Sequence, residues 1–117
     1  MQIKIKLKQI FPSNPPRKIS WDRVSNIENT EEYFEIINTK EKYNLPKYLP
    51  REGNHRLAKL YEKFGPNYQI KVKILEINLD NDLKNYQEGW IRCQSEGINN
   101  YRDFVDAAKT GCWERTP

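Results

Sequence analysis

The first strand-like segment, QIKIKLKQI at residues 2–10, constrains the fold more than any other feature because its aliphatic and polar residues alternate strictly. Successive side chains of a β-strand point to opposite faces of a sheet, so this alternation predicts a strand with one buried face. Ile3, Ile5 and Leu7 would face the core. The opposite face would carry a row of lysines: Lys4, Lys6 and Lys8.

A second segment, QIKVKIL at residues 69–75, repeats the same alternation and places Lys71 and Lys73 on one face. If the two strands are neighbours in the sheet, five lysines share a single face. Like charges directly opposite each other on paired strands cost stability. Such a face would therefore favour an anionic partner or interleaved acidic residues.

Two amphipathic helices are predicted at about 54–64 and 100–110. In each, apolar residues recur at the i, i+3, i+4 and i+7 spacing of a half-buried helix. Asn54 is expected to cap the first helix, and Gly65 with the proline after it would end it. Asn100 begins the second helix, with Asp103 in its first turn as the helix dipole prefers.

The region 18–45 is more ambiguous. A strand is expected around KISWDRV, and the segments EEYFEIIN and KEKYNL are interpreted as two strands joined at Thr39 and Lys40. A helix capped by Asn29 is the alternative for this stretch. LPKYLPREG would then be a connection interrupted by prolines.

Between the lysine strand and the second helix, DNDLKN is interpreted as a turn and EGWIRCQS as one further strand. The fold class predicted from these elements is α+β. The 117 residues would form a single small domain, 1–117, with a mostly antiparallel or mixed sheet and the two amphipathic helices packed on it. No apolar run approaches the roughly 20 residues that a membrane-spanning helix needs, and a cytoplasmic protein is expected.

The residue types that carry catalysis are sparse. His55 is the only histidine, and no glycine-rich phosphate loop or nucleophile elbow is present. The spacing of Cys93 and Cys112 fits neither a zinc knuckle nor a redox pair. Asp82 with an upstream acid such as Glu62 or Glu76 would suit a metal-dependent nuclease, but short acid–lysine spacings arise readily by chance. An enzyme is therefore less expected than a binding protein, with no cofactor and no metal.

The distribution of charge along the sequence indicates which class of partner to expect. Net charge is +4, and basic blocks at 1–23 and 50–75 alternate with acidic blocks at 24–49 and 76–117. Lysines mixed with aromatic rings are typical of RNA and single-stranded nucleic-acid binding, where cations meet phosphates and rings stack on bases. The candidate contact residues are Lys4, Lys6, Lys8, Arg17, Lys18, Trp21, Lys71, Lys73 and Arg92.

The function predicted from these features is a small non-catalytic nucleic-acid-binding module, serving as a subunit of a larger nucleoprotein assembly. The alternative is a protein–protein interaction module, such as an adaptor or a small inhibitor of a larger complex. The lysine row also has a purely structural interpretation, since lysines protect an edge strand from pairing with other chains. Neither a membrane nor a small-molecule substrate is expected as a partner.

Overall fold

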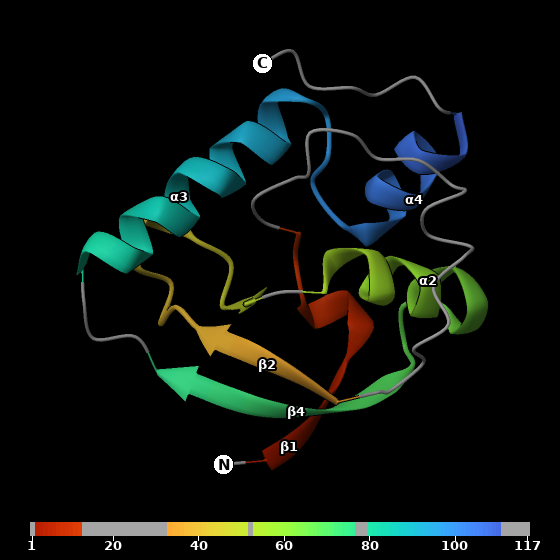
Figure 1. The fold of residues 1–117 in the computed structure, drawn as a ribbon, viewed down its shortest axis with the longest axis horizontal. Helices are drawn as coiled ribbons and strands as arrows, with labels where there is room; N and C mark the ends of the chain where they lie inside the picture. The colour runs from red at the N-terminus through yellow and green to blue at the C-terminus, as the bar shows by residue number, and fades with distance from the viewer. Residues whose placement is uncertain (1, 13–32, 52, 77–79, 111–117) are drawn as a thin grey trace.

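The computed structural model of the chain describes residues 2–12, 33–51, 53–76 and 80–110. The elements and their bounds, in chain order, are β1 (Gln2–Lys6), the short 3-10 helix η1 (Leu7–Gln9), β2 (Tyr33–Asn38), the short 3-10 helix η2 (Lys42–Asn44), β3 (Tyr48–Pro50), α2 (Asn54–Phe64), β4 (Gln69–Glu76), α3 (Asp80–Ser95) and α4 (Tyr101–Thr110). Figure 1 shows their arrangement.

The strands form one four-stranded sheet in the order β1-β4-β2-β3. β1 runs antiparallel to β4, β2 runs parallel to β4, and β3 runs antiparallel to β2. The predicted mixed sheet and the α+β class are therefore confirmed. Three α-helices accompany the sheet in the described ranges, one more than the sequence indicated.

The main core lies between one face of the sheet and the helices α2 and α4, which sit side by side (Figure 1). Both helices were predicted from their apolar spacing, and both are confirmed. An ion pair between Glu62 and Lys109 joins their outer surfaces. The fully buried side chains of this core include Phe34, Ile36, Leu57, Ile70, Val72 and Phe104.

The ends of the two helices follow the expected signals with one difference. Gly53, with a left-handed φ of 94°, occupies the N-cap position of α2, and Asn54 is the first helical residue. Gly65, with φ of 87°, follows the last residue of the same helix. At α4, the backbone N–H of Asp103 donates to Oδ1 of Asn100 at 2.8 Å, so the Asn100 side chain caps the helix.

The interpretation of residues 80–95 as a turn and a strand was wrong, because the whole segment forms the helix α3. Leu83, Tyr86, Trp90 and Cys93 recur at helical spacing, and they bury one side of α3 against the rest of the molecule. Taking DNDLKN and EGWIRCQS as separate segments hid this period, since each half is too short to display it.

The second strand of the hairpin was also misplaced. KEKYNL contains η2 and four residues with left-handed φ values, at Lys40, Glu41, Tyr43 and Asn44. Left-handed backbone cannot continue a strand. The antiparallel partner of β2 is instead β3, within the segment assigned to a connection. Its Pro50 is tolerated because β3 is an edge strand.

β1 is shorter than the predicted strand over residues 2–10. It ends at Lys6, whose backbone N–H donates to Oε1 of Gln9 at 2.8 Å, and η1 follows directly. Lys8 therefore lies outside the sheet. The strand predicted around KISWDRV falls outside the described residues, and the helix alternative capped by Asn29 is contradicted where it would overlap β2.

Candidate nucleic-acid interface

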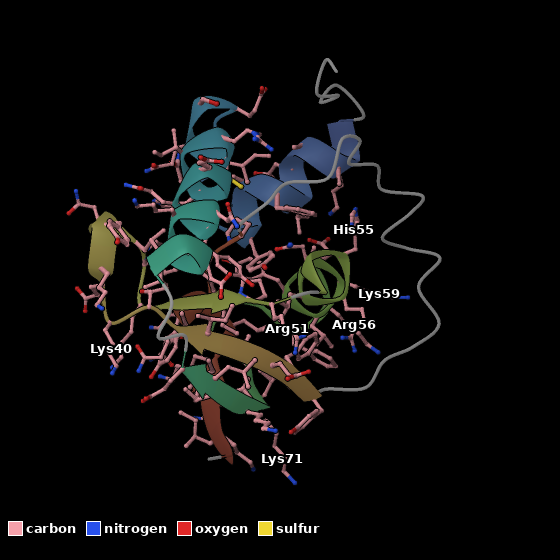
Figure 2. All side chains as sticks on the ribbon, turned by 60° about the vertical axis from the view of Figure 1, so that its left-hand side comes forward. Lys40, Arg51, His55, Arg56, Lys59 and Lys71 are labelled. Atoms are coloured by element: carbon pink, nitrogen blue, oxygen red, sulfur yellow. The ribbon has the colours of Figure 1, made fainter. Side chains whose placement is uncertain are left out.

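The two lysine-bearing strands are neighbours in the sheet. β1 pairs with β4 so that Lys4 lies directly opposite Lys71, and Lys6 lies opposite Gln69. Residues directly opposite each other share a face, and so do residues two apart on one strand. Four lysines consequently occupy the sheet face opposite the main core, and we refer to Lys4, Lys6, Lys71 and Lys73 as the lysine face. Figure 2 shows Lys71 projecting from the sheet on the side away from α2 and α4.

β2 extends this face on the other side of β4. In the parallel register Tyr33 lies beside Lys71, and Glu35 lies beside Lys73. The Glu35 carboxylate is 3.4 Å from the guanidinium of Arg51. Among the described residues, no ion pair involves a member of the lysine face. Glu35 is thus an acidic neighbour of Lys73 on this face, although its carboxylate pairs with Arg51.

A hollow of about 480 Å³ opens on the lysine face. Its lining combines two lysines, two tyrosines and one amide: Lys4, Lys71, Tyr33, Tyr68 and Gln69. We call it the lysine–tyrosine hollow. Its volume falls within the range of roughly 300–1,000 Å³ that small-molecule sites occupy. The lining offers cations, ring faces and a group that both donates and accepts hydrogen bonds.

Aromatic side chains around this hollow are unusually exposed. Tyr33 is 40% exposed, and Phe64, at the last position of α2, is 44% exposed. The Phe64 ring stacks on Tyr68 with centroids 4.2 Å apart and planes 14° apart. Lys63 places its Nζ 5.1 Å from the Phe64 ring centroid. The end of α2 thus adds an aromatic pair and another cation next to the hollow.

The chain reversal after α2 holds Tyr68 in place. The backbone N–H of Leu7 donates to the carbonyl of Tyr68 at 2.9 Å, and that of Lys8 donates to the carbonyl of Pro66 at 2.9 Å. These bonds attach η1 to the segment that leads into β4. Because η1 follows β1 directly, they bring Tyr68 beside the strand that carries Lys4.

Sequence reasoning missed Tyr33, Tyr68, Gln69 and Phe64. A signal was available for Tyr33: alternation within YFEIIN places it on the face opposite Phe34, which is buried. The alternation of QIKVKIL likewise placed Gln69 on the face of Lys71. No comparable signal marked Tyr68 and Phe64, since their stacking depends on how the chain turns between α2 and β4.

The remaining predicted contact residues do not join the lysine face. Lys8 is exposed but belongs to η1 rather than to the strand. Arg92 lies in the last turn of α3, so its predicted position on a strand face is wrong. Arg17, Lys18 and Trp21 lie outside the described residues.

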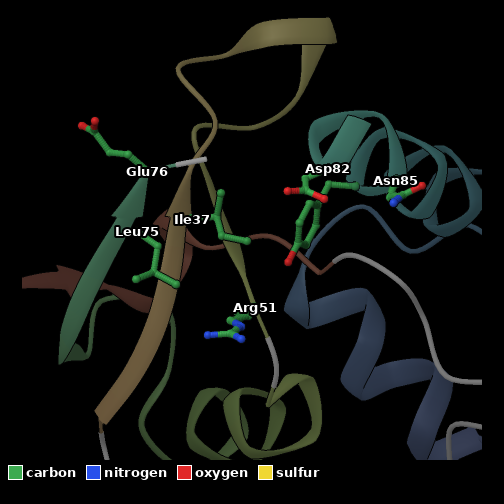
Figure 3. A pocket seen from close by; sticks show the side chains of 7 residues that line it. Ile37, Arg51, Leu75, Glu76, Asp82 and Asn85 are labelled. Atoms are coloured by element: carbon green, nitrogen blue, oxygen red, sulfur yellow. The ribbon is translucent and has the colours of Figure 1, made fainter. Parts of the chain in front are cut away.

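A second hollow, of about 550 Å³, lies between the far end of β2 and β4 and the first half of α3 (Figure 3). Apolar side chains of Ile37 and Leu75 and the ring of Tyr86 line it, with Arg51 and Asp82 among its polar groups. Burial raises the pKa of the Tyr86 phenol; nearby Arg51 opposes this increase, and Asp82 adds to it. This hollow is mixed in charge and chemically distinct from the lysine–tyrosine hollow.

Glu76 and Asp82, an acid pair considered for a nuclease, both line this second hollow. Figure 3 shows the carboxylate of Glu76 turned away from Asp82. Glu76 instead pairs with Lys40 at 3.8 Å. In the described ranges, no group of three or more His, Cys, Asp and Glu side chains is arranged to hold a metal ion. The nuclease hypothesis gains no support from this geometry.

His55 and Cys93 both take part in packing. The His55 ring meets Phe104 edge-on, with centroids 5.4 Å apart. Cys93 is buried in the main core, and this burial raises the pKa of its thiol to about 12. A thiol with so high a pKa is protonated at neutral pH and is a poor nucleophile. Cys112 lies outside the described residues.

None of the described helices combines the length and apolarity needed to cross a membrane. Comparison of the chain with protein-family models, with curated protein sequences and with solved structures found no match. The function of this chain is therefore to be inferred from its own side chains and their arrangement.

Proposed function

We propose that the chain is a non-catalytic nucleic-acid-binding module that contacts its ligand through the lysine face. The observation that carries this proposal is the direct pairing of Lys4 with Lys71 at the edge of a hollow that two tyrosines also line. Both lysines are exposed, and like charges in this position cost stability in the free protein. A bound polyanion removes that cost.

The spread of the charge favours a polymer over a single small anion. Lys71 and Lys73 are two residues apart on β4, which separates them by roughly 7 Å along the strand. Lys4 lies on the neighbouring strand, roughly 5 Å to one side. An array of this extent suits successive phosphates of a backbone, while the exposed rings suit bases.

The test measures binding of labelled RNA and DNA oligonucleotides by fluorescence anisotropy over a range of salt concentrations. Phosphate contacts release counterions, so affinity should fall steeply as salt rises. The double variant Lys4→Glu/Lys71→Glu should lose binding. Removing one lysine contact by a Lys→Gln change should reduce the logarithmic salt slope by about 0.7 on single strands.

Lys8→Glu is the matched control, because it makes the same charge reversal in η1, outside the sheet. It should bind nearly as well as the parent chain. Equal loss from Lys4→Glu and Lys8→Glu would indicate a net-charge effect and contradict a role for the lysine face. Binding that is insensitive to salt and to all these variants would contradict nucleic-acid binding itself.

A protein-interaction module, such as an adaptor or inhibitor, is the second candidate, and one observation favours it. Ile91 on α3 is 55% exposed and lies next to a smaller hollow of about 270 Å³, which Tyr43 and Trp90 also line. Large exposed apolar side chains mark contact surfaces when they cluster. A partner complex that survives nuclease treatment and is lost in Ile91→Asp would favour this function over the first.

A further inference from the structure

We infer that the ligand of the lysine face is single-stranded and that one unpaired base enters the lysine–tyrosine hollow, with Lys4 and Lys71 contacting the adjoining phosphates. This inference depends on the proposed nucleic-acid-binding function. It adds a substrate class, single strand rather than duplex, and a position for the base.

The composition of the hollow distinguishes the two forms of nucleic acid. A flat row of lysines would serve duplex and single-stranded phosphates alike. The hollow adds the rings of Tyr33 and Tyr68, which can stack only on a base whose face is accessible. In a duplex the base faces are stacked on one another, so that only an unpaired base gains from these rings.

Tyr68 is already ordered in the free protein. Phe64 stacks on it at 4.2 Å, it packs partly buried against the main core, and its carbonyl accepts the hydrogen bond from Leu7. Because Phe64 already occupies one face of the Tyr68 ring, Tyr68 forms a fixed wall of the hollow that loses little conformational freedom when a base enters. Tyr33, which is 40% exposed, is the ring on which the base would stack.

The remaining lining groups suit a base with a phosphate on each side. Gln69 is exposed, and its amide both donates and accepts, so it can meet the polar edge of any base. Lys4 and Lys71 flank the hollow from adjacent strands. This combination predicts tolerance of base identity together with a requirement that a base be present.

The test compares three probes at one salt concentration: a single strand of about ten nucleotides, a single strand of abasic residues of the same length, and the duplex of the same sequence, which carries about twice as many phosphates. The ordinary single strand should bind roughly tenfold more tightly than either of the others, within the range that base–aromatic stacking supplies. Tyr33→Leu, which keeps apolar bulk but removes the ring, should lower affinity for the ordinary single strand at least fivefold. It should leave affinity for the abasic strand and the duplex unchanged.

Lys71→Gln is the matched control, because it should weaken binding of all three probes by a similar factor. Equal affinity for the ordinary and abasic strands, or a Tyr33→Leu variant that binds like the parent chain, would overturn the inference while leaving charge-dependent binding intact. Failure of the proposed function would instead appear as weak, salt-insensitive binding of every probe. A circular dichroism melt of Tyr33→Leu checks that the variant is folded.

Discussion

Replacing Lys4 with glutamate should stabilise the free protein while weakening its binding to nucleic acid. Lys4 and Lys71 are directly opposed, which places their Cβ atoms roughly 5 Å apart. A directly opposed charge pair contributes roughly 0.2–1 kcal/mol, unfavourable for like charges and favourable for opposite charges. The Lys4→Glu exchange removes the unfavourable like-charge interaction with Lys71 and adds a favourable opposite-charge interaction in its place. Since both side chains are exposed and screened, we expect a net gain of about 0.5–1 kcal/mol in the free energy of unfolding.

Equilibrium unfolding in urea at low salt measures this gain, because urea, unlike guanidinium chloride, adds no ions. With a slope of about 2 kcal/mol per molar urea, the midpoint should rise by about 0.25–0.5 M. Lys4→Gln, which only removes the repulsion, should give a smaller increase. At about 1 M salt the Debye length falls to about 3 Å, and the difference between parent and variant should largely disappear.

Two controls decide whether the pair itself is responsible. Lys8→Glu changes the net charge by the same amount but has no partner in the sheet, so it should leave the midpoint nearly unchanged. In Lys4→Glu/Lys71→Glu the opposed charges are again alike, so the gain should vanish. An unchanged or lowered midpoint for Lys4→Glu, or an equal rise for Lys8→Glu, would refute the argument that the opposed lysines destabilise the free protein.

Two further predictions concern the core and its helices. Cys93 has a folded-state pKa of about 12, above its ordinary 9.0, so the stabilisation from its protonated form is complete below about pH 9 and is lost as pH rises from 9 to 12. In urea unfolding between pH 8 and 10.5, this thiol should lower the free energy of unfolding by up to about 1.4 kcal/mol per pH unit. Cys93→Ala should lack this part of the pH dependence. Identical pH dependence in parent and variant would contradict the assignment of the effect to Cys93. Asn100→Ala should lower stability by about 0.5–2 kcal/mol through loss of the 2.8 Å cap to Asp103, whereas Asn99→Ala, which leaves that cap in place, should have a smaller effect in thermal melts monitored by circular dichroism.

Much of the local structure was accessible from the sequence because it depends on short-range periodicity. The alternation in QIKIKLKQI and QIKVKIL predicted two strands, and the apolar spacing after Asn54 and Asn100 predicted two helices. The failures occurred where short segments lacked a full period. α3 was divided at its centre, and β3, with three residues, carried too little pattern to compete with the prolines around it.

In the candidate site, too, part of the arrangement follows from local periodicity and part depends on strand pairing. That Lys4 and Lys6 share a face, and that Lys71 and Lys73 share a face, follows from the two-residue period of a strand and needs no tertiary information. Their union into one lysine face required β1 and β4 to pair across more than sixty residues of chain, and no local pattern encodes a pairing partner. Alternation in YFEIIN could have placed Tyr33 on its face, but its neighbour Lys71 follows only from the parallel pairing of β2 with β4.

The amino-acid sequence by itself determined which side chains each strand and helix presents, because local backbone geometry sets that periodicity. Only the tertiary structure decided which of those faces lie together. The hollow on the lysine face exists because hydrogen bonds from η1 hold the chain after α2 beside β1, bringing Tyr68 to Lys4. Contacts between segments so far apart in the chain are selected by burial of the common core, and a site built from them is visible only once the chain has folded.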